Sequence, residues 1–240
     1  MAVELPAGVV AVTGEQMRKV LEVAAQNGLP PAAWLDRAAE RVVEVAERVA
    51  GGLADKRVVV LAGPTASGGI GLAAAARWPQ RGAKALVVLA RKRKEYVGDL
   101  ASRIATAEGA GAKVLEGFQE KIFDEAALVV DALLGTELAG PPMGSYSLLI
   151  KAANFSMKPV LALEVPSGLD PETGSTPGPC MRAKATVAFG MPRKGLLAAT
   201  AERATGEVWL ADVGLTRETY ARAGVAANEP FHDGPLLRLR

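Results

Sequence analysis

Residues 58–71 read VVVLAGPTASGGIG, a short apolar run that enters a glycine-rich turn and continues into an alanine-rich stretch. An apolar run without polar alternation is typical of a strand buried on both faces of a parallel sheet. Glycines let the backbone approach a ligand closely, and the free N–H groups at the start of a following helix attract anions. The stretch therefore predicts a strand, a tight turn and a helix, with an anion site at the turn.

The turn matches neither of the two common phosphate-binding motifs. Thr65 stands where the dinucleotide-binding motif has its second glycine, and Gly69 and Ile70 stand where Walker A has Lys and Ser or Thr. A purely structural turn needs the same glycines, so this alternative stays open. The basic run from Arg91 to Lys94, after the next apolar run, leaves a similar choice between contact with a 2′-phosphate and a solvated loop.

Similar apolar runs alternate with helix-length segments over most of the chain. They predict seven strands, at residues 58–61, 85–89, 112–115, 128–131, 160–164, 186–189 and 208–211. Two helices precede them: one at about 14–27, after the capping-box pair Thr13 and Gln16, and one that ends at Gly51 and Gly52. This alternation predicts an α/β fold of three layers, Rossmann-like and doubly wound around a mostly parallel sheet.

Length and composition limit the classes of protein that the chain can represent. With 240 residues, half of them hydrophobic, it can form one domain at 1–225, and we expect the polar stretch at 226–240 to be a flexible tail. A net charge of +2 gives no field that favours nucleic acid or an anionic membrane surface. The single cysteine, Cys180, and the lack of a signal peptide or an apolar run of spanning length predict a cytoplasmic protein without a membrane segment.

Two carboxylates, Asp131 and Glu164, end apolar runs, and Ser167 follows in a second predicted turn. A buried carboxylate is costly unless it is paired, hydrogen-bonded or used in chemistry. Because strand ends meet in one crevice of a doubly wound sheet, both are candidate functional groups. Accepting N–H bonds from loops is the structural alternative for Asp131. The only histidine, His232, lies in the expected tail, which argues against a nucleophilic triad, and only oxygen ligands remain for a hard cation.

Four strings occur in order along the chain: GPTASGGIG from Gly63, VDALLGTE from Val130, EVPSGLDPETG from Glu164 and FGMPRKGL from Phe189. In the YjeF N-terminal family the corresponding strings read GxGNNGGDG, VDALFGTG, DIPSGLD with TG soon after, and FGxPKxGL. The chain resembles this family over residues 12–215. The resemblance implies the activity of an NAD(P)HX epimerase, which interconverts the R and S forms of NADH and NADPH hydrated at C6.

The resemblance also implies ligands and partners. The hydrated nucleotide is a small-molecule substrate, so no tightly bound organic cofactor is expected, and in the family a potassium ion lies beside the nucleotide. A homodimer is implied as the assembly. A separate ADP- or ATP-dependent NAD(P)HX dehydratase is the implied functional partner.

Matching the motifs position by position transfers the family's site to this chain. Asp131 is the implied catalytic residue, and Ser67, Asp131 and Ser167 are the implied potassium ligands. The implied substrate- and nucleotide-binding residues are Thr65, Ala66, Ser67, Gly68, Gly69, Gly135, Thr136, Glu137, Leu138, Ala139, Gly140, Pro141 and Glu164.

The chain departs from the family pattern at several of these positions. Ala66 and Ser67 replace two Asn residues, Ile70 replaces an Asp, Glu137 replaces a Gly, and Arg193 replaces a Lys. Removing hydrogen-bonding groups from a site weakens transition-state stabilisation. Two alternatives to the epimerase therefore stay open: a catalytically degenerate homologue that binds a nucleotide or serves as a scaffold or dimerisation protein, and an unrelated phosphate-ligand enzyme on the same fold.

Overall fold

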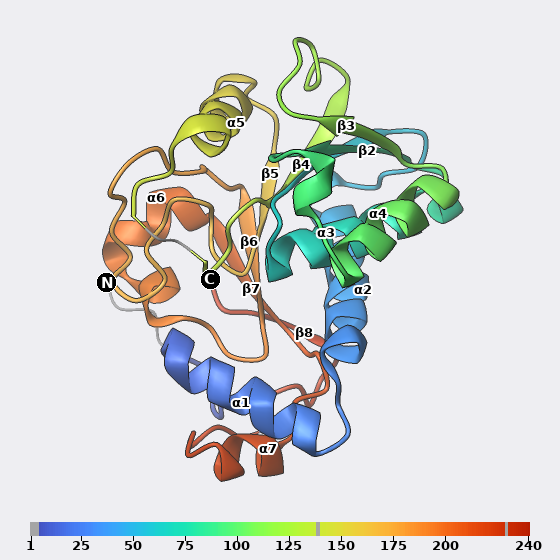
Figure 1. Ribbon diagram of the computed structural model, residues 1–240. Helices are drawn as coiled ribbons and strands as arrows, with labels where there is room; N and C mark the ends of the chain where they lie inside the picture. The colour runs from blue at the N-terminus through green and yellow to red at the C-terminus, as the bar shows by residue number, and fades with distance from the viewer. Residues whose placement is uncertain (1–4, 138–139, 229) are drawn as a thin grey trace.

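One eight-stranded sheet forms the middle layer of the molecule, for which a computed structural model describes residues 5–137, 140–228 and 230–240. The strand order is β3-β2-β1-β4-β5-β6-β7-β8, and all neighbours are parallel except β7 and β8 (Figure 1). The strands are β1 (Arg57–Ala62), β2 (Lys84–Leu89), β3 (Lys113–Glu116), β4 (Ala126–Ala132), β5 (Val160–Leu163), β6 (Ala185–Phe189), β7 (Glu207–Ala211) and β8 (Leu236–Arg238). The seven predicted strands are all present, which confirms the mostly parallel α/β architecture.

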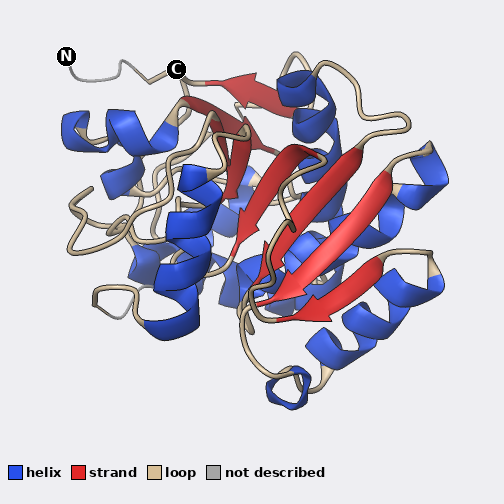
Figure 2. Cartoon of the chain, turned by 90° about the horizontal axis from the view of Figure 1, so that it is seen from above, coloured by secondary structure: helices blue, strands red, loops and turns tan. Residues whose placement is uncertain are grey.

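Helices cover both faces of the sheet (Figure 2). The α-helices are α1 (Gly14–Gln26), α2 (Pro31–Ala50), α3 (Ala66–Arg77), α4 (Asp99–Gly109), α5 (Gly144–Phe155), α6 (Glu202–Thr205) and α7 (Arg217–Arg222), and short 3-10 helices lie at Pro79–Arg81, Arg93–Glu95, Lys194–Leu197 and Ala199–Ala201. Val58 and Val60 of β1 belong to a core shared with α2 and α3, whereas Val59 and Leu61 belong to a core shared with α5. This alternation confirms three layers. None of the described helices is long and apolar enough to cross a membrane.

The two N-terminal helices start and end where the local sequence predicts. The Thr13 hydroxyl accepts a hydrogen bond from Gln16 N–H at 3.1 Å, and the Gln16 side chain accepts one from Thr13 N–H at 2.9 Å. Gly51 ends α2 in the left-handed conformation, with a φ of 62°. The segment before α1 pairs with the loop after β6, because Val12 N–H donates to the Pro192 carbonyl at 2.9 Å. This pairing anchors α1 beside the carboxyl end of the sheet.

The segment 226–240, expected to be a flexible tail, instead adds a strand to the sheet. Residues Leu236–Arg238 form β8, which runs antiparallel to β7 with Leu237 opposite Leu210. Arg238 also forms an ion pair with Glu207 at 3.4 Å. The strand is three residues long and only half-buried, so its sequence shows no apolar run that would predict it.

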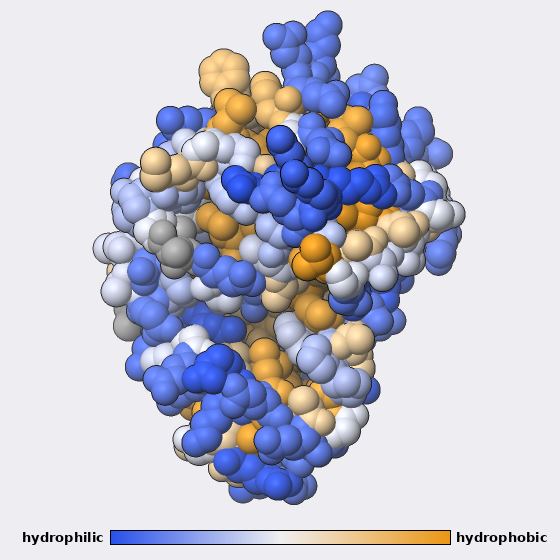
Figure 3. Space-filling model, viewed as in Figure 1, coloured by the Kyte–Doolittle hydropathy of each residue, from blue (hydrophilic) through white to orange (hydrophobic). Residues whose placement is uncertain are grey.

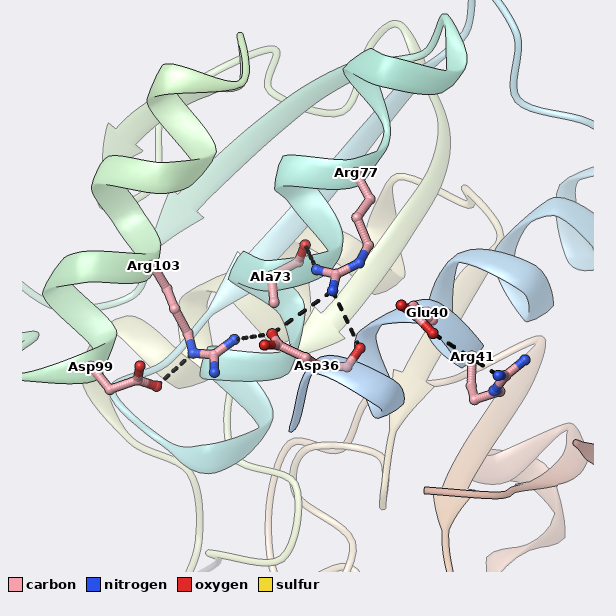
Figure 4. A network of polar contacts seen from close by, with 7 residues as sticks. All are labelled: Asp36, Glu40, Arg41, Ala73, Arg77, Asp99 and Arg103. Atoms are coloured by element: carbon pink, nitrogen blue, oxygen red, sulfur yellow. Dashed lines mark hydrogen bonds and ion pairs between the residues drawn. The ribbon is translucent and has the colours of Figure 1, made fainter. Parts of the chain in front are cut away.

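Asp36 ties α2 to the two helices beside it (Figure 4). Its carboxylate lies 2.9 Å from a guanidinium nitrogen of Arg103 in α4 and 3.8 Å from one of Arg77 in α3. Arg103 also pairs with Asp99, one turn earlier in α4, at 2.5 Å. Because the Arg103 side chain is only 9% exposed, its charge requires such partners. The network links α3 to α2 and connects α2 to α4.

The winding of the sheet reverses between β1 and β4. From β1 the chain builds outward to β2 and β3 on one side, and from β4 it builds outward on the other. In sheets of this kind the loops after the two central strands diverge and leave a crevice at the carboxyl ends. The glycine-rich turn follows β1 and residues 133–137 follow β4, so both border this crevice.

Candidate active site

The glycine-rich turn joins β1 to α3 in close contact with the end of β4. A Cβ atom on Gly63 would collide with the Leu133 carbonyl oxygen, and one on Gly68 would collide with the Gly63 carbonyl oxygen. The Thr65 hydroxyl caps α3 by accepting a hydrogen bond from Gly68 N–H at 3.0 Å. The structural need for glycine, left open by the sequence, is therefore present whatever the turn binds.

The first N–H group of α3 meets a carboxylate of the protein itself. Ala66 N–H donates a hydrogen bond to Glu137 Oε1 at 3.0 Å. The free N–H groups and the dipole of a helix N-terminus stabilise such a negative charge. The predicted anion position is thus taken by Glu137, and a phosphate that bound there would have to displace this side chain.

Asp131 lies in a set of hydrogen bonds that uses both of its oxygens. Oδ1 accepts bonds from the Ser167 hydroxyl at 2.7 Å and Leu133 N–H at 3.3 Å, and Oδ2 accepts one from Ser167 N–H at 2.7 Å. Burial raises the pKa of this carboxyl, and the three hydrogen bonds oppose the rise. Asp131 therefore accepts hydrogen bonds from loop N–H groups, which is the structural role predicted as an alternative. Its role as an acid or base stays a prediction.

Ser67, Glu164 and Arg193 form a second polar cluster. Glu164 directly follows β5 and has a φ of +62°, in the left-handed region. The Ser67 hydroxyl donates to Glu164 Oε2 at 2.8 Å, and a guanidinium nitrogen of Arg193 lies 3.7 Å from Glu164 Oε1. Burial lowers the pKa of the Arg193 guanidinium, whereas the Glu164 carboxylate raises it. Three separate segments therefore place a carboxylate between a hydroxyl and a cation.

A groove of about 680 Å³ opens beside this cluster. Its lining comes from α1, α2, the start of α3 and the loops after β4, β5 and β6, and consists of Gly14, Glu15, Arg18, Leu21, Glu22, Ala25, Pro31, Trp34, Ala66, Thr136, Glu164 and Arg193. Figure 3 shows apolar atoms in the hollow above α1. The volume lies within the range of about 300–1,000 Å³ that is usual for sites of small ligands.

The structure sorts the predicted nucleotide-binding residues into several groups. Three of them line the groove, namely Ala66, Thr136 and Glu164, and Glu137 is hydrogen-bonded to Ala66 without being part of the lining. A buried group supports the lining without being part of it: Thr65, Ser67, Gly68, Gly69 and Gly135. Gly140 and Pro141 are exposed and do not line the groove. Leu138 and Ala139 lie outside the described residues.

The side chains that the N-terminal helices contribute to this groove were not predicted from the sequence. Arg18 and Leu21 of α1 and Trp34 of α2 line it, together with Arg193. Arg193 lies in the string FGMPRKGL, so the motif offered a signal for it. The helical residues belong to no motif, and only the tertiary pairing that anchors α1 brings them to the site.

The three residues predicted to bind potassium do not offer a set of free oxygens. The Ser167 hydroxyl donates to Asp131 and accepts a hydrogen bond from Leu134 N–H at 3.0 Å. Asp131 accepts three hydrogen bonds, and Ser67 donates its proton to Glu164. A hard cation is held by several oxygens at once. A potassium ion bound by these three residues would therefore have to share or replace their mutual hydrogen bonds.

Both arginines of the basic run after β2 form ion pairs within the protein. Arg91 Nε lies 2.9 Å from Glu95, and Arg93 forms a two-point ion pair with Glu108. A guanidinium that is already paired gains less from a phosphate, because it must first lose its partner. These pairs favour the interpretation of the basic run as a solvated loop over its interpretation as a contact for a 2′-phosphate.

Cys180 is expected to react slowly with alkylating reagents. Burial raises the pKa of its thiol to about 12, and the nearby Asp131 charge adds to the rise. Because the thiolate is the reactive form, iodoacetamide at pH 8 should modify the native protein about 10³-fold more slowly than the urea-unfolded protein. Mass spectrometry of timed samples measures both rates, and similar rates would show that the fold does not protect the thiol.

The chain is similar to known proteins over most of its length. The sequence profile of the family described as YjeF-related protein N-terminus matches residues 32–195. The bifunctional NAD(P)H-hydrate repair enzyme Nnr of Moorella thermoacetica is 32% identical over 219 residues, which cover 88% of this chain and 41% of that enzyme. The NAD(P)H-hydrate epimerase of Dehalogenimonas lykanthroporepellens is 35% identical over 185 residues, which cover 76% of this chain and 73% of that protein.

A solved structure shares the fold. The crystal structure of yeast YNL200c aligns with a TM-score of 0.81 and 19% sequence identity, and the alignment covers 96% of this chain and 100% of that chain. At this identity the likeness speaks for the fold alone, and it agrees with the sheet described above. The profile match and the two relatives speak for common descent over most of the chain. The chain belongs to the family of YjeF-related protein N-terminus domains.

Proposed function

We propose that this protein is an NAD(P)H-hydrate epimerase, which interconverts the R and S forms of NADH and NADPH hydrated at C6 of the nicotinamide ring. The observation that carries the proposal is the groove at the carboxyl ends of the central strands, which has Glu164 and Arg193 in its lining. Relatives that bear the name NAD(P)H-hydrate epimerase support the same activity.

The lining of the groove suits an uncharged ring with polar groups on one side. Leu21, Pro31 and Trp34 give an apolar wall, which would exclude water from the ring. Glu164 offers hydrogen-bond acceptors and Arg193 offers donors, so a ring hydroxyl and a carboxamide both find partners. Binding in this orientation would hold the hydrated carbon near the polar cluster.

Further features of the proposal come from the family resemblance. They are a potassium requirement, a homodimer, a cytoplasmic location and a separate dehydratase that acts on the same hydrated nucleotide. Bifunctional relatives agree with a link to a second repair activity. Among the described residues, large exposed apolar side chains on and beside α5 are available for a dimer contact, at Met143, Leu148, Phe155 and Met157.

A homologue that binds the nucleotide without catalysis is the second candidate. Ile70 is fully buried in the apolar core, so no polar group stands at this position of the turn. Ala66 offers the groove only a methyl group and an N–H that is already bonded to Glu137. A protein with these changes keeps a groove for the ligand but has fewer groups that act on it.

Chiral chromatography of (6R)-NADPHX incubated with the purified protein tests the proposal. We expect conversion at least about 100-fold faster than the spontaneous reaction. Leu21→Trp should abolish this rate by filling the groove, and Val97→Trp, at an exposed apolar side chain outside the groove, serves as its control. Replacing potassium with sodium in the buffer tests the cation requirement. Calorimetric binding of NADPHX without any rate enhancement would favour the second candidate.

A further inference from the structure

Three carboxylates stand at the carboxyl end of the central strands, and they differ in access to the groove. Asp131 is only 1% exposed and is absent from the lining. Glu137 is exposed and is bonded to Ala66 N–H. Glu164 is both largely buried, with a side chain 12% exposed, and part of the groove wall. Only Glu164 therefore combines a shielded position with direct access to a ligand.

Glu164 lines the groove, and one of its two oxygens has no hydrogen-bond partner among the described residues. Oε2 accepts the Ser67 hydroxyl proton at 2.8 Å. Oε1 lies 3.7 Å from the Arg193 guanidinium, which is beyond hydrogen-bond length, so it attracts the cation without being capped by it. A group that accepts a proton from a ligand needs such a free lone pair within reach of the ligand.

The two partners of Glu164 are themselves fixed. Ser67 is 1% exposed, and its hydroxyl packs so closely on Gly135 that a Cβ atom on that glycine would collide with it. Arg193 is 7% exposed and donates to the Met191 carbonyl at 3.3 Å. Burial and these contacts restrict the movement of both side chains. The carboxylate is therefore held from both sides by groups with little freedom.

We propose that Glu164 is the catalytic acid–base residue of this site and that Ser67 and Arg193 are its positioning residues. The proposal rests on the epimerase function proposed above. In the hydrated ring, C6 carries both the hydroxyl group and the ring nitrogen N1, so the ring can open and close at that carbon.

The step balances without an oxidant or a second reactant. Glu164 removes the hydroxyl proton, the O–H electron pair becomes the second bond of a C6 aldehyde, and the C6–N1 bond breaks with its pair left on N1. Glu164 then gives the same proton to N1. After rotation about the bond between C5 and C6, Glu164 takes the proton from N1, N1 attacks the other face of C6, and the new C6 oxygen recovers the proton.

Steady-state epimerisation of NADPHX by the full chain and its variants tests this assignment. Glu164→Gln keeps the shape of the side chain and should lower kcat at least about 100-fold, as loss of an acid–base group does. KM should stay within about threefold, because the amide still fills the same space. Glu120→Gln, at an exposed carboxylate on the loop between β3 and β4, is the matched control and should retain the wild-type rate.

A double-mutant cycle tests the role of Ser67. Ser67→Ala should lower kcat about tenfold in the wild-type background and have no further effect in Glu164→Gln, because it acts through the carboxylate. A purely structural contribution would lower the rate in both backgrounds and would overturn the positioning role.

Chemical rescue covers the case in which Glu164→Gln does not fold. Glu164→Gly suits the φ of +62°, and added formate should restore its rate at least about tenfold by taking the place of the carboxylate. A wild-type protein without activity would contradict both the proposed function and this assignment. An active wild type with an equally active Glu164→Gln, or a Glu164→Gly that formate does not rescue, would overturn only the assignment.

Discussion

Alanine at Gly68 is expected to lower the free energy of unfolding by about 3 kcal/mol, because the new side chain overpacks the turn. Its Cβ atom would collide with the Gly63 carbonyl oxygen, which belongs to the backbone of the same turn and cannot rotate aside. A shift of this backbone would also weaken the cap that Thr65 forms with Gly68 N–H at 3.0 Å. Urea unfolding followed by circular dichroism measures the loss.

Gly69→Ala is the matched control for this substitution. A Cβ atom at Gly69 meets the end of the Leu100 side chain at 3.2 Å, and that side chain is able to adjust. Alanine also favours a helix over glycine by about 1 kcal/mol at both positions. The control should therefore stay within about 1 kcal/mol of the wild type. Equal unfolding midpoints for the two variants would show that position 68 does not require glycine.

Asp131→Asn is expected to lower the free energy of unfolding by about 3 kcal/mol at pH 7, because buried donors lose their acceptor. The carboxylate accepts hydrogen bonds from Leu133 N–H and from both the N–H and the hydroxyl of Ser167. An amide presents an NH₂ group to at least one of these donors, and bulk solvent has little access to a residue that is 1% exposed. Asp124→Asn, at an exposed aspartate, should leave the urea midpoint unchanged.

The stability gap between the wild type and Asp131→Asn is expected to narrow as the pH rises. Burial raises the pKa of Asp131 in the folded protein above its ordinary value of about 3.9. Folding therefore favours the protonated carboxyl. Its contribution to the free energy of unfolding is fully present at a pH below the ordinary pKa, and it is lost as the pH rises through the pKa of the folded state. Urea unfolding of both proteins from about pH 4 upward measures the gap. A gap that widens with pH would mean that the hydrogen bonds outweigh burial.

The fold could be predicted from sequence where local patterns reflect burial on both faces. Six of the seven predicted strands have apolar runs because they lie inside the sheet, and the seventh, β3, was predicted although it lies at the border of the sheet. β8 was missed because a three-residue edge strand is half-exposed and needs no apolar run. Its partner Trp209 lies far away in sequence, and only the tertiary structure brings the two segments together.

The site could be predicted only where a residue breaks a local rule or belongs to a motif. Asp131 and Glu164 stood out because a charge at the end of an apolar run requires an explanation. The sequence could not predict that Glu164 lines the groove and Asp131 does not, because this difference depends on where their partners Ser67 and Ser167 lie in space. Trp34 gave no signal, since an aromatic residue in a helix usually packs in the core.

The short eighth strand also bears on how the molecule behaves at high concentration. An open strand edge offers free N–H and C=O groups to which another chain can add, and short strands with charged side chains discourage this addition. β8 covers the outer edge of β7 and is itself three residues long, with an exposed Arg238. At the other border, β3 is four residues long and has exposed Lys113 and Glu116 at its two ends. Both borders of the sheet are thus protected against edge-to-edge aggregation.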